Sequence, residues 1–360
     1  MIERLWIAFL GILAATAVVG AGTLVLSILL ARFDRRREAA RRVVRPAILS
    51  RLYRPSPEWA TWYEGLSRIE RHVARRTVAT YLRRLRGRER EELTRFAKEV
   101  GIDERARSSL SSRLLLNRLR GLVWLALLER PVSQQRLREH CTDRPETRAG
   151  AARVVYASNA SHADRDGTAL LCWDGDERLS VFALDTLYRL NDDDATALLS
   201  LAATEGTWWN EELLVQALTV LGHCRAPGSG AGTHLEWIRS LLEHDSPRIR
   251  AGALVALSRQ GWSRSVRERV PIERAIADPD PDVRTAAYEL LGRWNDETSN
   301  RWLEYGVRND PSDRSRLAAA RRLSRSDRPL PDSPSDSVER TVAWVRAEHR
   351  SPRRVATGWS

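Results

Sequence analysis

The sequence has few of the residues from which recognisable chemical sites are built. Its three cysteines, Cys141, Cys172 and Cys224, are too few and too scattered for a disulfide framework, which favours a reducing compartment. Only one of its 59 basic residues is a lysine, and Lys98 lies in no glycine-rich loop, so a GxxxxGK[ST] phosphate-binding loop is absent. No GxSxG serine occurs either. The sequence therefore predicts no enzyme, no catalytic residue and no cofactor.

Metal-ligand spacings are also missing. The dipeptides His140-Cys141 and His223-Cys224 combine zinc-ligand types, but no CxxC or HxxxH spacing accompanies them, so no metal site is predicted. The acidic run at residues 192–194 is better explained by capping of a helix N-terminus, where negative charge is stabilising. The glycine-rich string APGSGAG at residues 226–232 is predicted to be a loop between helices.

The N-terminal segment contains a long apolar run. No charged residue occurs from Leu5 to Ala31, and this run exceeds the roughly 20 apolar residues that cross a bilayer. The alternative, a cleaved signal peptide, needs a basic leading segment, whereas here Glu3 and Arg4 cancel. We therefore predict a transmembrane anchor over residues 1–33.

A basic cluster follows the apolar run directly. Positive charge beside a membrane segment marks the cytoplasmic side, so we expect a single-pass protein of the cell membrane with its N-terminus outside and its C-terminal part in the cytoplasm. The same cluster is expected to lie against anionic lipid. Its members are seven arginines: Arg32, Arg35, Arg36, Arg37, Arg41, Arg42 and Arg45.

The net charge of +12 is concentrated in one third of the chain. Residues 32–130 hold 26 basic and 12 acidic side chains, whereas residues 131–360 hold 32 and 34. A slightly acidic C-terminal part argues against binding of nucleic acid, which requires a basic groove. Residues 34–111 are predicted to form a basic juxtamembrane helical region, because apolar and polar residues alternate there with helical spacing, as at Leu66, Ile69, Val73, Thr77 and Tyr81.

The C-terminal part contains a repeat. Six strings of similar pattern, 32 to 36 residues apart, align on a small residue with an aliphatic residue four positions later. Turns rich in aspartate and proline precede several of them, and proline suits the first turn of a helix. The central residues are Ala151, Ala183, Ala217, Ala253, Ala287 and Ala319, with a weaker unit at Gly121.

These units resemble HEAT repeats, and DPDPDVRTAAYELLGRW at residues 278–294 is the best match. The resemblance covers residues 112–325 and is strongest over 234–325. It implies an all-α fold in which helix pairs stack into an α-solenoid, also called armadillo-like. Residues 326–360 are predicted to be a linker and an amphipathic helix that either caps the last repeat or docks elsewhere.

The resemblance also implies a ladder of ion pairs along the stack. In HEAT repeats an arginine near the start of the second helix commonly interacts with aspartates of the turn. The units around Ala183 and Ala217 depart from this pattern, because they carry Ser180 and Leu214 at the arginine position. The implied ladder joins Arg148, Arg250, Arg284 and Arg316 with Asp143, Asp245, Asp280 and Asp313.

A membrane anchor followed by a solenoid is typical of a scaffold. The expected function is a membrane-tethered adaptor for protein–protein interaction, with a protein partner. The alternative is an accessory subunit of a membrane enzyme, such as an envelope or polysaccharide synthase; a lyase or nucleic-acid enzyme on a HEAT-like fold ranks third. The sequence has 13 tryptophans, and those at 208 and 209 are either exposed interface anchors or part of the core.

Overall fold

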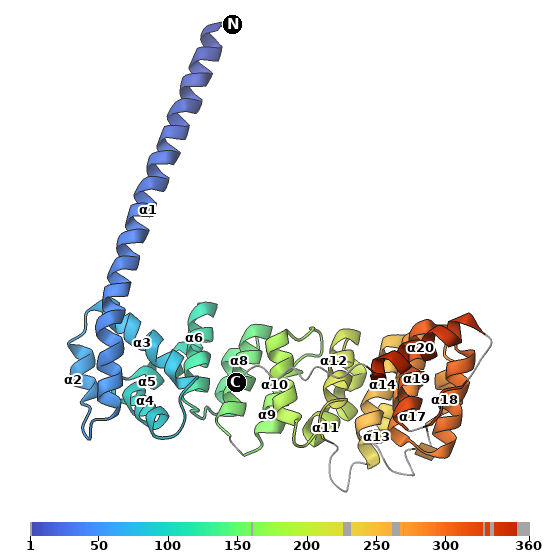
Figure 1. Cartoon of the computed structure of the whole chain (residues 1–360). Coiled ribbons are helices and arrows are strands. Elements are labelled where there is room, and N and C mark those ends of the chain that lie inside the picture. The colour runs from blue at the N-terminus through green and yellow to red at the C-terminus, as the bar shows by residue number, and fades with distance from the viewer. Residues whose placement is uncertain are drawn as a thin grey trace. The chain divides into compact units, whose positions relative to one another are not determined.

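The computed structural model describes residues 2–159, 161–225, 232–260, 267–268, 270–326, 328–331 and 335–350 (Figure 1). The side chains of residues 2–15, 17, 18, 232–234, 260, 349 and 350 lie outside this description. Over the described residues the secondary structure is entirely helical, which confirms the predicted all-α class. The chain divides into two units between Arg130 and Pro131.

Unit 1, residues 1–130, is built around a small aromatic core. The indole of Trp59 is fully buried and meets the ring of Phe96 edge-on, with centroids 5.2 Å apart. The last four turns of α1 pack on α3 around this core. The helices of unit 1 are α1 (Ile2–Leu52), α2 (Trp59–Glu64), α3 (Arg68–Leu82), α4 (Gly87–Glu99), α5 (Ile102–Ser108), the 3-10 turn η1 (Ser109–Ser111) and α6 (Leu115–Leu127).

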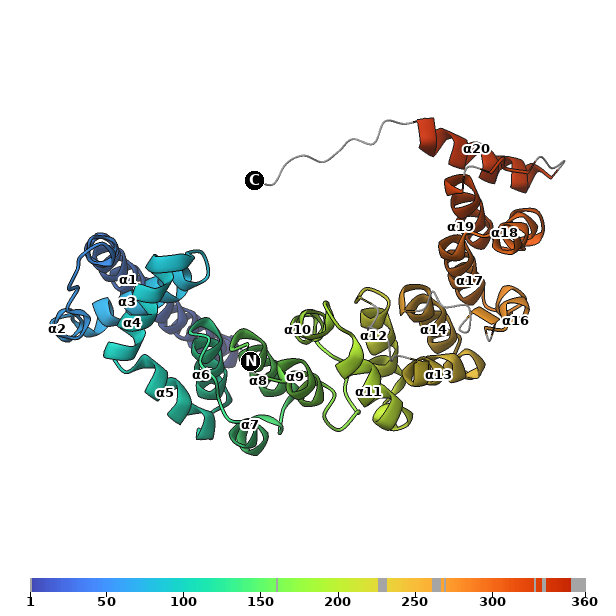
Figure 2. The ribbon, with the colours of Figure 1, turned by 90° about the horizontal axis from the view of Figure 1, so that it is seen from below.

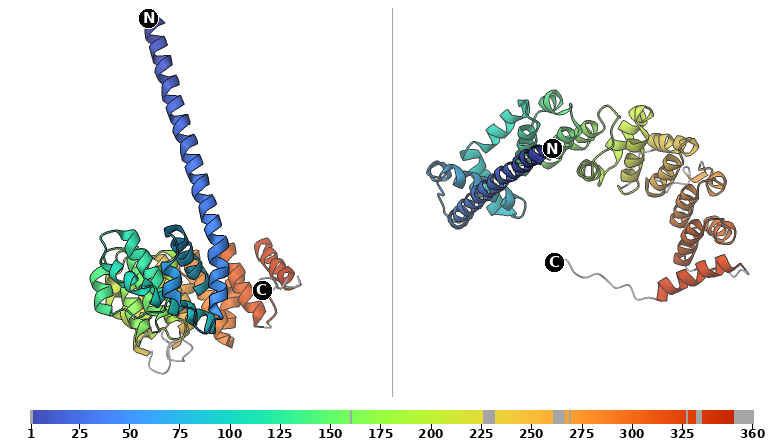
Figure 3. Two further views of the ribbon diagram at one scale, coloured as in Figure 1. Left: turned by 90° about the vertical axis from the view of Figure 1, so that its left-hand side faces the viewer. Right: turned by 90° about the horizontal axis from the view of Figure 1, so that it is seen from above.

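The N-terminal half of α1 extends beyond the other helices of unit 1 (Figure 3). Where its side chains are described, from Val19 to Leu30, the large apolar ones are exposed on every side of the helix, because consecutive residues are exposed alike. Leu24 is 63% exposed and Leu29 55%. The others are Val19, Val25, Leu26, Ile28 and Leu30.

The predicted membrane span, residues 5–31, falls partly on side chains outside the described residues. Among the residues that are described, no helix has both the length and the apolarity needed to cross a membrane.

The boundary at residue 130 places α6 in unit 1, whereas the sequence pattern around Gly121 assigned this helix to the repeats. The reason lies in close packing between α6 and the α5–η1 segment. A Cβ atom at Gly121 would lie 2.7 Å from the carbonyl oxygen of Ala106 and would overlap the hydroxyl of Ser109. The small residue at 121 thus serves a contact with the preceding helix of unit 1.

Unit 2, residues 131–360, consists of successive helix pairs (Figure 2). In each pair the first helix packs on the second, and the second helices also pack on one another in chain order. The pairs are α7 (Gln134–Cys141) with α8 (Pro145–Ala157), α9 (Ala163–Leu171) with α10 (Val181–Asn191), α11 (Thr196–Glu205) with α12 (Glu211–Leu221), α13 (Gly232–Ser240) with α14 (Pro247–Gln260), α16 (Ile272–Ile276) with α17 (Pro281–Trp294), and α18 (Glu297–Asn309) with α19 (Asp313–Arg325). Short 3-10 turns follow α11 and α13: η2 (Gly206–Trp208) and η3 (Leu241–Glu243).

The six aligned alanines all lie on second helices, and all are buried. A small side chain at the centre of the helix lets the neighbouring helix approach closely. Helix starts follow the expected chemistry: Ser180 and Asn210 cap α10 and α12 by accepting a backbone N–H three residues on, and Pro281 opens α17. In the acidic run at 192–194, Asp194 accepts the N–H of Thr196 (2.8 Å) at the start of α11, as predicted, whereas Asp192 lies at the C-terminal end of α10.

The last helix, α20 (Asp336–Arg350), packs on α19. Val338, Val342 and Val345 are buried in this contact, while Trp344 is 63% exposed. The carboxylate of Glu348 accepts two hydrogen bonds from the guanidinium of Arg321 (3.0 and 3.2 Å). The predicted loop at residues 226–232 lies outside the described residues except for Gly232, where α13 begins, and part of the predicted linker at 326–335 also lies outside them.

Candidate anion-binding site

The candidate site lies where α1 packs on α3. Residues of α1 spaced four apart, Ala40, Val44 and Ile48, are buried and face the buried Val73 and Val78 of α3. Side chains four residues apart lie on one helical face, so this stripe joins the two helices.

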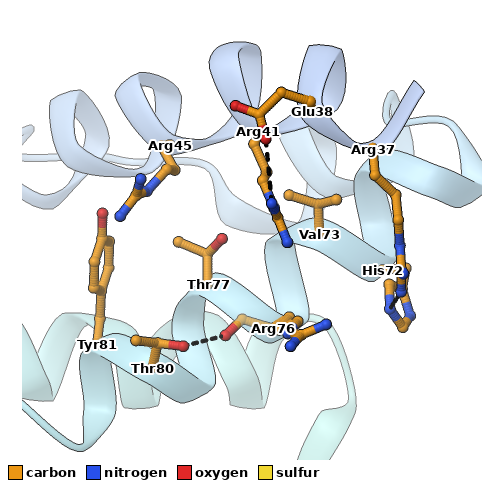
Figure 4. Close-up of a pocket in the computed structure, with 10 residues that line it drawn as sticks. All are labelled: Arg37, Glu38, Arg41, Arg45, His72, Val73, Arg76, Thr77, Thr80 and Tyr81. Carbon is orange, nitrogen blue, oxygen red and sulfur yellow. Dashed lines mark hydrogen bonds and ion pairs between the residues drawn. The ribbon is translucent and has the colours of Figure 1, made fainter. Parts of the chain in front are cut away.

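Beside the buried stripe runs a second stripe of α1 with the same spacing, and it is basic. Arg41 and Arg45 each follow a buried residue, and Arg37 lies one turn earlier. These side chains border a cavity of about 390 Å³ between the two helices (Figure 4). Across the cavity, α3 contributes His72, Val73, Arg76, Thr77, Thr80 and Tyr81.

The cavity carries a net positive charge. Four arginines line it, and the only carboxylate is Glu38, which pairs with Arg41 (3.2 Å), so three positive charges are left unbalanced. Neither Arg45 nor Arg76 has an acidic partner among the described residues. The guanidinium of Arg37 is held in place, because it donates to Nε2 of His72 (3.0 Å) and lies over the ring of Phe33 (4.9 Å to the centroid).

The imidazole of His72 is kept neutral by its surroundings. Partial burial of the ring lowers the pKa of His72, and the positive charges of Arg37, Arg75, Arg76 and Arg120 lower it further. A neutral ring can accept the hydrogen bond from Arg37, with its proton on Nδ1. The electrostatic potential around His72 is thus strongly positive, and a bound anion would lower it.

Guanidinium groups and hydroxyls are suited to a phosphate or carboxylate. Arginine binds such groups through paired N–H donors, and the hydroxyls of Thr77 and Tyr81 add neutral donors at the same cavity. The cavity has no nucleophile paired with a base, so the arrangement supports binding rather than a reaction.

Of the seven arginines predicted to contact the membrane surface, the structure brings three to the cavity: Arg37, Arg41 and Arg45. The other four, Arg32, Arg35, Arg36 and Arg42, are exposed and do not line it. Sequence reasoning missed His72 and Arg76. Their spacing of four residues was a signal, but the face of α3 that meets α1 follows only from tertiary packing.

In unit 2 the ladder arginines form ion pairs, but mostly with acceptors other than the predicted ones. Arg250 donates to both carboxylate oxygens of Asp278 (2.8 and 2.9 Å), and Arg284 donates to both of Asp310 (2.9 and 3.1 Å). The predicted partner Asp245 contributes only its backbone carbonyl to Arg250 (2.9 Å). The prediction of Asp245 and Asp280 as carboxylate partners was therefore wrong.

The physical reason lies in the turns. The carboxylate of Asp280 accepts its own helix's N–H from Asp282 (2.8 Å), so it serves as the N-cap of α17. Each arginine instead extends to the following turn. Arg250 reaches Asp278, which begins the turn before α17, and Arg284 reaches Asp310, which begins the turn before α19.

The first member of the ladder follows the same rule, because its acceptor lies in the turn before α10, and only the last member, Arg316, pairs within its own repeat. Arg148 binds Glu177 (2.6 Å) in place of the predicted Asp143, and Asp143 accepts the hydroxyl of Thr147 (3.3 Å). Arg316 does pair with the predicted Asp313.

The three cysteines are buried, and burial raises the pKa of the Cys172 and Cys224 thiols to about 12. Among the described residues no group of three potential metal ligands comes together. The thiols of Cys172 and Cys224 are therefore protonated at neutral pH, in a form that neither attacks nor binds metal readily.

Apolar side chains are exposed around the loop between α9 and α10. Val181 is 86% exposed and Trp208 82%, and the neighbouring Trp209 is buried, so the two tryptophans take opposite roles. Asn210 links the two segments by donating its N–H to the carbonyl of Gly175 (2.9 Å). We call Trp173, Val181, Phe182 and Trp208 the apolar loop surface.

Comparisons with protein-family models, with curated proteins and with solved structures find no match for this chain.

Proposed function

We propose that this protein is a membrane-tethered adaptor. Residues 5–31 cross the bilayer once, the N-terminus lies outside, and unit 2 forms a HEAT-like α-solenoid in the cytoplasm that recruits a protein. The proposal depends on one observation above all: the N-terminal half of α1 is apolar on every side and exposed where its side chains are described. A helix that is apolar all round requires an apolar surrounding.

Length and charge support a bilayer as that surrounding. Residues 5–31 give about 40 Å of helix at 1.5 Å per residue, more than the roughly 30 Å of hydrocarbon to be crossed. The arginines that follow favour the cytoplasmic side. Because α1 continues without a break from Ile2 to Leu52, a membrane-embedded segment would hold unit 1 directly at the bilayer surface.

The solenoid is supported by the buried alanines and by the packing of each second helix on the next. Helix pairs of this kind bury their apolar faces against their neighbours, and such stacks offer long binding surfaces. The apolar loop surface supplies exposed aromatic groups, which are the usual anchors of protein interfaces.

The membrane part of the proposal is tested by extraction. We expect the full chain to stay with membranes at alkaline carbonate pH and to be released by detergent. Protease added outside intact cells should leave residues 34–360 uncut. Release by carbonate alone would refute the anchor.

The adaptor part is tested by affinity purification of the full chain in detergent. A Phe182→Ser/Trp208→Ser variant should lose a partner that the unchanged protein retains. The matched control is Tyr305→Ser/Trp344→Ser, which removes two exposed aromatic rings elsewhere in unit 2. Equal recovery with both variants would refute the apolar loop surface as the interface.

A second candidate function is favoured by the small residues of α1. Gly20 and Gly22 have nothing within 4 Å of an added Cβ atom, so they leave room for another helix at close range. In this case the protein is an accessory subunit of a membrane enzyme and contacts it in the bilayer. Exchange of residues 5–31 for an unrelated apolar helix should then abolish function, whereas a simple tether would tolerate it.

A further inference from the structure

The arginine-lined cavity lies close to the end of the proposed membrane segment. Arg37 is about 9 Å beyond Ala31 along α1, and the cavity continues about 12 Å further to Arg45, at 1.5 Å per residue. The polar headgroup layer on each side of a bilayer is about 5–8 Å thick. The long side chain of Arg37, which lies over Phe33, therefore reaches the level of the headgroups, whereas Arg45, about 21 Å beyond Ala31, lies past that layer, so a lipid headgroup enters the cavity from its Arg37 end.

We propose that this cavity binds the phosphate group of an anionic lipid headgroup. Arg45 and Arg76 supply the free guanidinium groups, and Arg41, Thr77 and Tyr81 complete the set of donors. The inference rests on the proposed function, since a membrane lipid reaches the cavity only if residues 5–31 lie in the bilayer.

Charge and size select the ligand class. Three unbalanced positive charges match a phosphate monoester or diphosphate better than a carboxylate of single charge. A volume of about 390 Å³ accommodates a small headgroup but not a nucleic-acid strand with its bases, and the aromatic rings that line the cavity are those of Tyr81 and of His72, which is engaged by Arg37.

The contacts of the four cavity arginines indicate that the site can bind an anion. Arg37 is engaged by His72, and Arg41 by Glu38, whereas Arg45 and Arg76 bind no acidic side chain among the described residues. They lie at different places along the cavity, Arg45 beside Tyr81 and Arg76 nearer His72 (Figure 4). A phosphate bound in the cavity would offset the positive charge of either group.

The same phosphate chemistry is available from a lipid or from a soluble ester, and the test separates them. The full chain is purified in a non-ionic detergent and titrated with dioctanoyl phosphatidic acid, with dioctanoyl phosphatidylcholine as the neutral lipid. Glycerol phosphate and inorganic phosphate serve as soluble ligands. Saturable binding of phosphatidic acid, with little binding of the other three ligands, is the expected result.

The test variant is Arg45→Gln/Arg76→Gln, which removes no side-chain hydrogen bond or ion pair among the described residues. Each arginine near an anionic surface contributes about 1 kcal/mol, or about fivefold in affinity, so the double variant should bind phosphatidic acid about 25-fold more weakly. The control is Arg54→Gln/Arg83→Gln, which removes two exposed arginines just after α1 and α3. Its affinity should change less than twofold.

Two results would overturn the proposal. Equal losses in both variants would mean general attraction of anions to a basic surface. Glycerol phosphate binding as tightly as phosphatidic acid would assign the cavity to a soluble phosphate ester. The titration is done in detergent, so its result does not depend on whether α1 crosses a bilayer. Carbonate extraction, in turn, does not depend on the cavity arginines. Failure of the lipid-binding proposal can therefore be told apart from failure of the membrane-anchor proposal.

Discussion

Arg284 and Asp310 form a bidentate ion pair inside unit 2, with both guanidinium–carboxylate contacts near 3 Å and the Asp310 side chain 1% exposed. Tyr288 donates its hydroxyl to the same carboxylate (3.0 Å). The pair joins helix α17 to the turn before α19, so it connects two successive helix pairs through buried charge.

Removal of one partner from this pair should be costly. Arg284→Met leaves the Asp310 carboxylate buried without its cation, and loss of one member of a buried pair costs about 3–5 kcal/mol. Urea unfolding of the detergent-solubilised chain, followed by tryptophan fluorescence, measures the change. Arg314→Gln is the control, because its ion pair with Asp282 is exposed and should contribute less than about 1 kcal/mol.

The pair of Arg250 with Asp278 predicts a dependence of stability on pH. Burial alone would raise the pKa of Asp278, but hydrogen bonds from Arg250 and from the N–H of Asp280, with the charges of Arg250 and Arg284, lower it below its usual value. The stabilisation is therefore complete above the unfolded pKa of about 4 and is lost as pH falls through the lower folded value.

Arg250→Gln tests this linkage. At pH 7 the variant should unfold about 1.5–3 kcal/mol more easily, because a charged hydrogen bond is lost. The gap between the two proteins should narrow as pH falls below about 4 and through the lower folded pKa of Asp278, at which the carboxylate of the unchanged protein becomes protonated. A gap that stays constant down to pH 2 would contradict the assigned role of the carboxylate.

Some of this architecture could be predicted from the sequence and some could not. The six aligned alanines are all buried on helices, because a repeated local pattern reports helix periodicity. The carboxylate partners of Arg250 and Arg284 lie one repeat further along the chain than predicted, since the sequence places Asp245 near Arg250 but does not reveal that Asp278 lies closer in space.

Only the α1 side of the cavity could be predicted from the sequence, for a similar reason. Spacing of four residues put Arg37, Arg41 and Arg45 on one face of α1, and that much follows from helix geometry alone. The contribution of Arg76 depends on which face of α3 turns toward α1, which is decided by packing of residues distant in sequence.

Close helix contacts make Gly306 of unit 2 sensitive to an added methyl group. A Cβ atom at Gly306 would lie 2.5 and 2.6 Å from two ring carbons of Tyr288 and 2.9 Å from its hydroxyl, and Tyr288 is itself buried and bound to Asp310. Gly306→Ala should therefore destabilise by about 1–3 kcal/mol, the cost of overpacking, although alanine is normally the better helix former. Gly252→Ala, where the nearest atoms lie at 3.2 Å, should cost less in the same urea experiment.

The attachment of α20 to α19 can be tested with two adjacent residues. Val345 is fully buried in that contact and Trp344 is largely exposed, so Val345→Asp places a carboxylate in an apolar site while Trp344→Asp places it in water. Each 1.4 kcal/mol of lost docking free energy raises the undocked population about tenfold. Trypsin should therefore cleave after Arg340 at least about tenfold faster in Val345→Asp, because cleavage follows the open population. Trp344→Asp should be cleaved at the rate of the unchanged protein, and equal acceleration in both variants would mean that α20 does not depend on its valine face for docking.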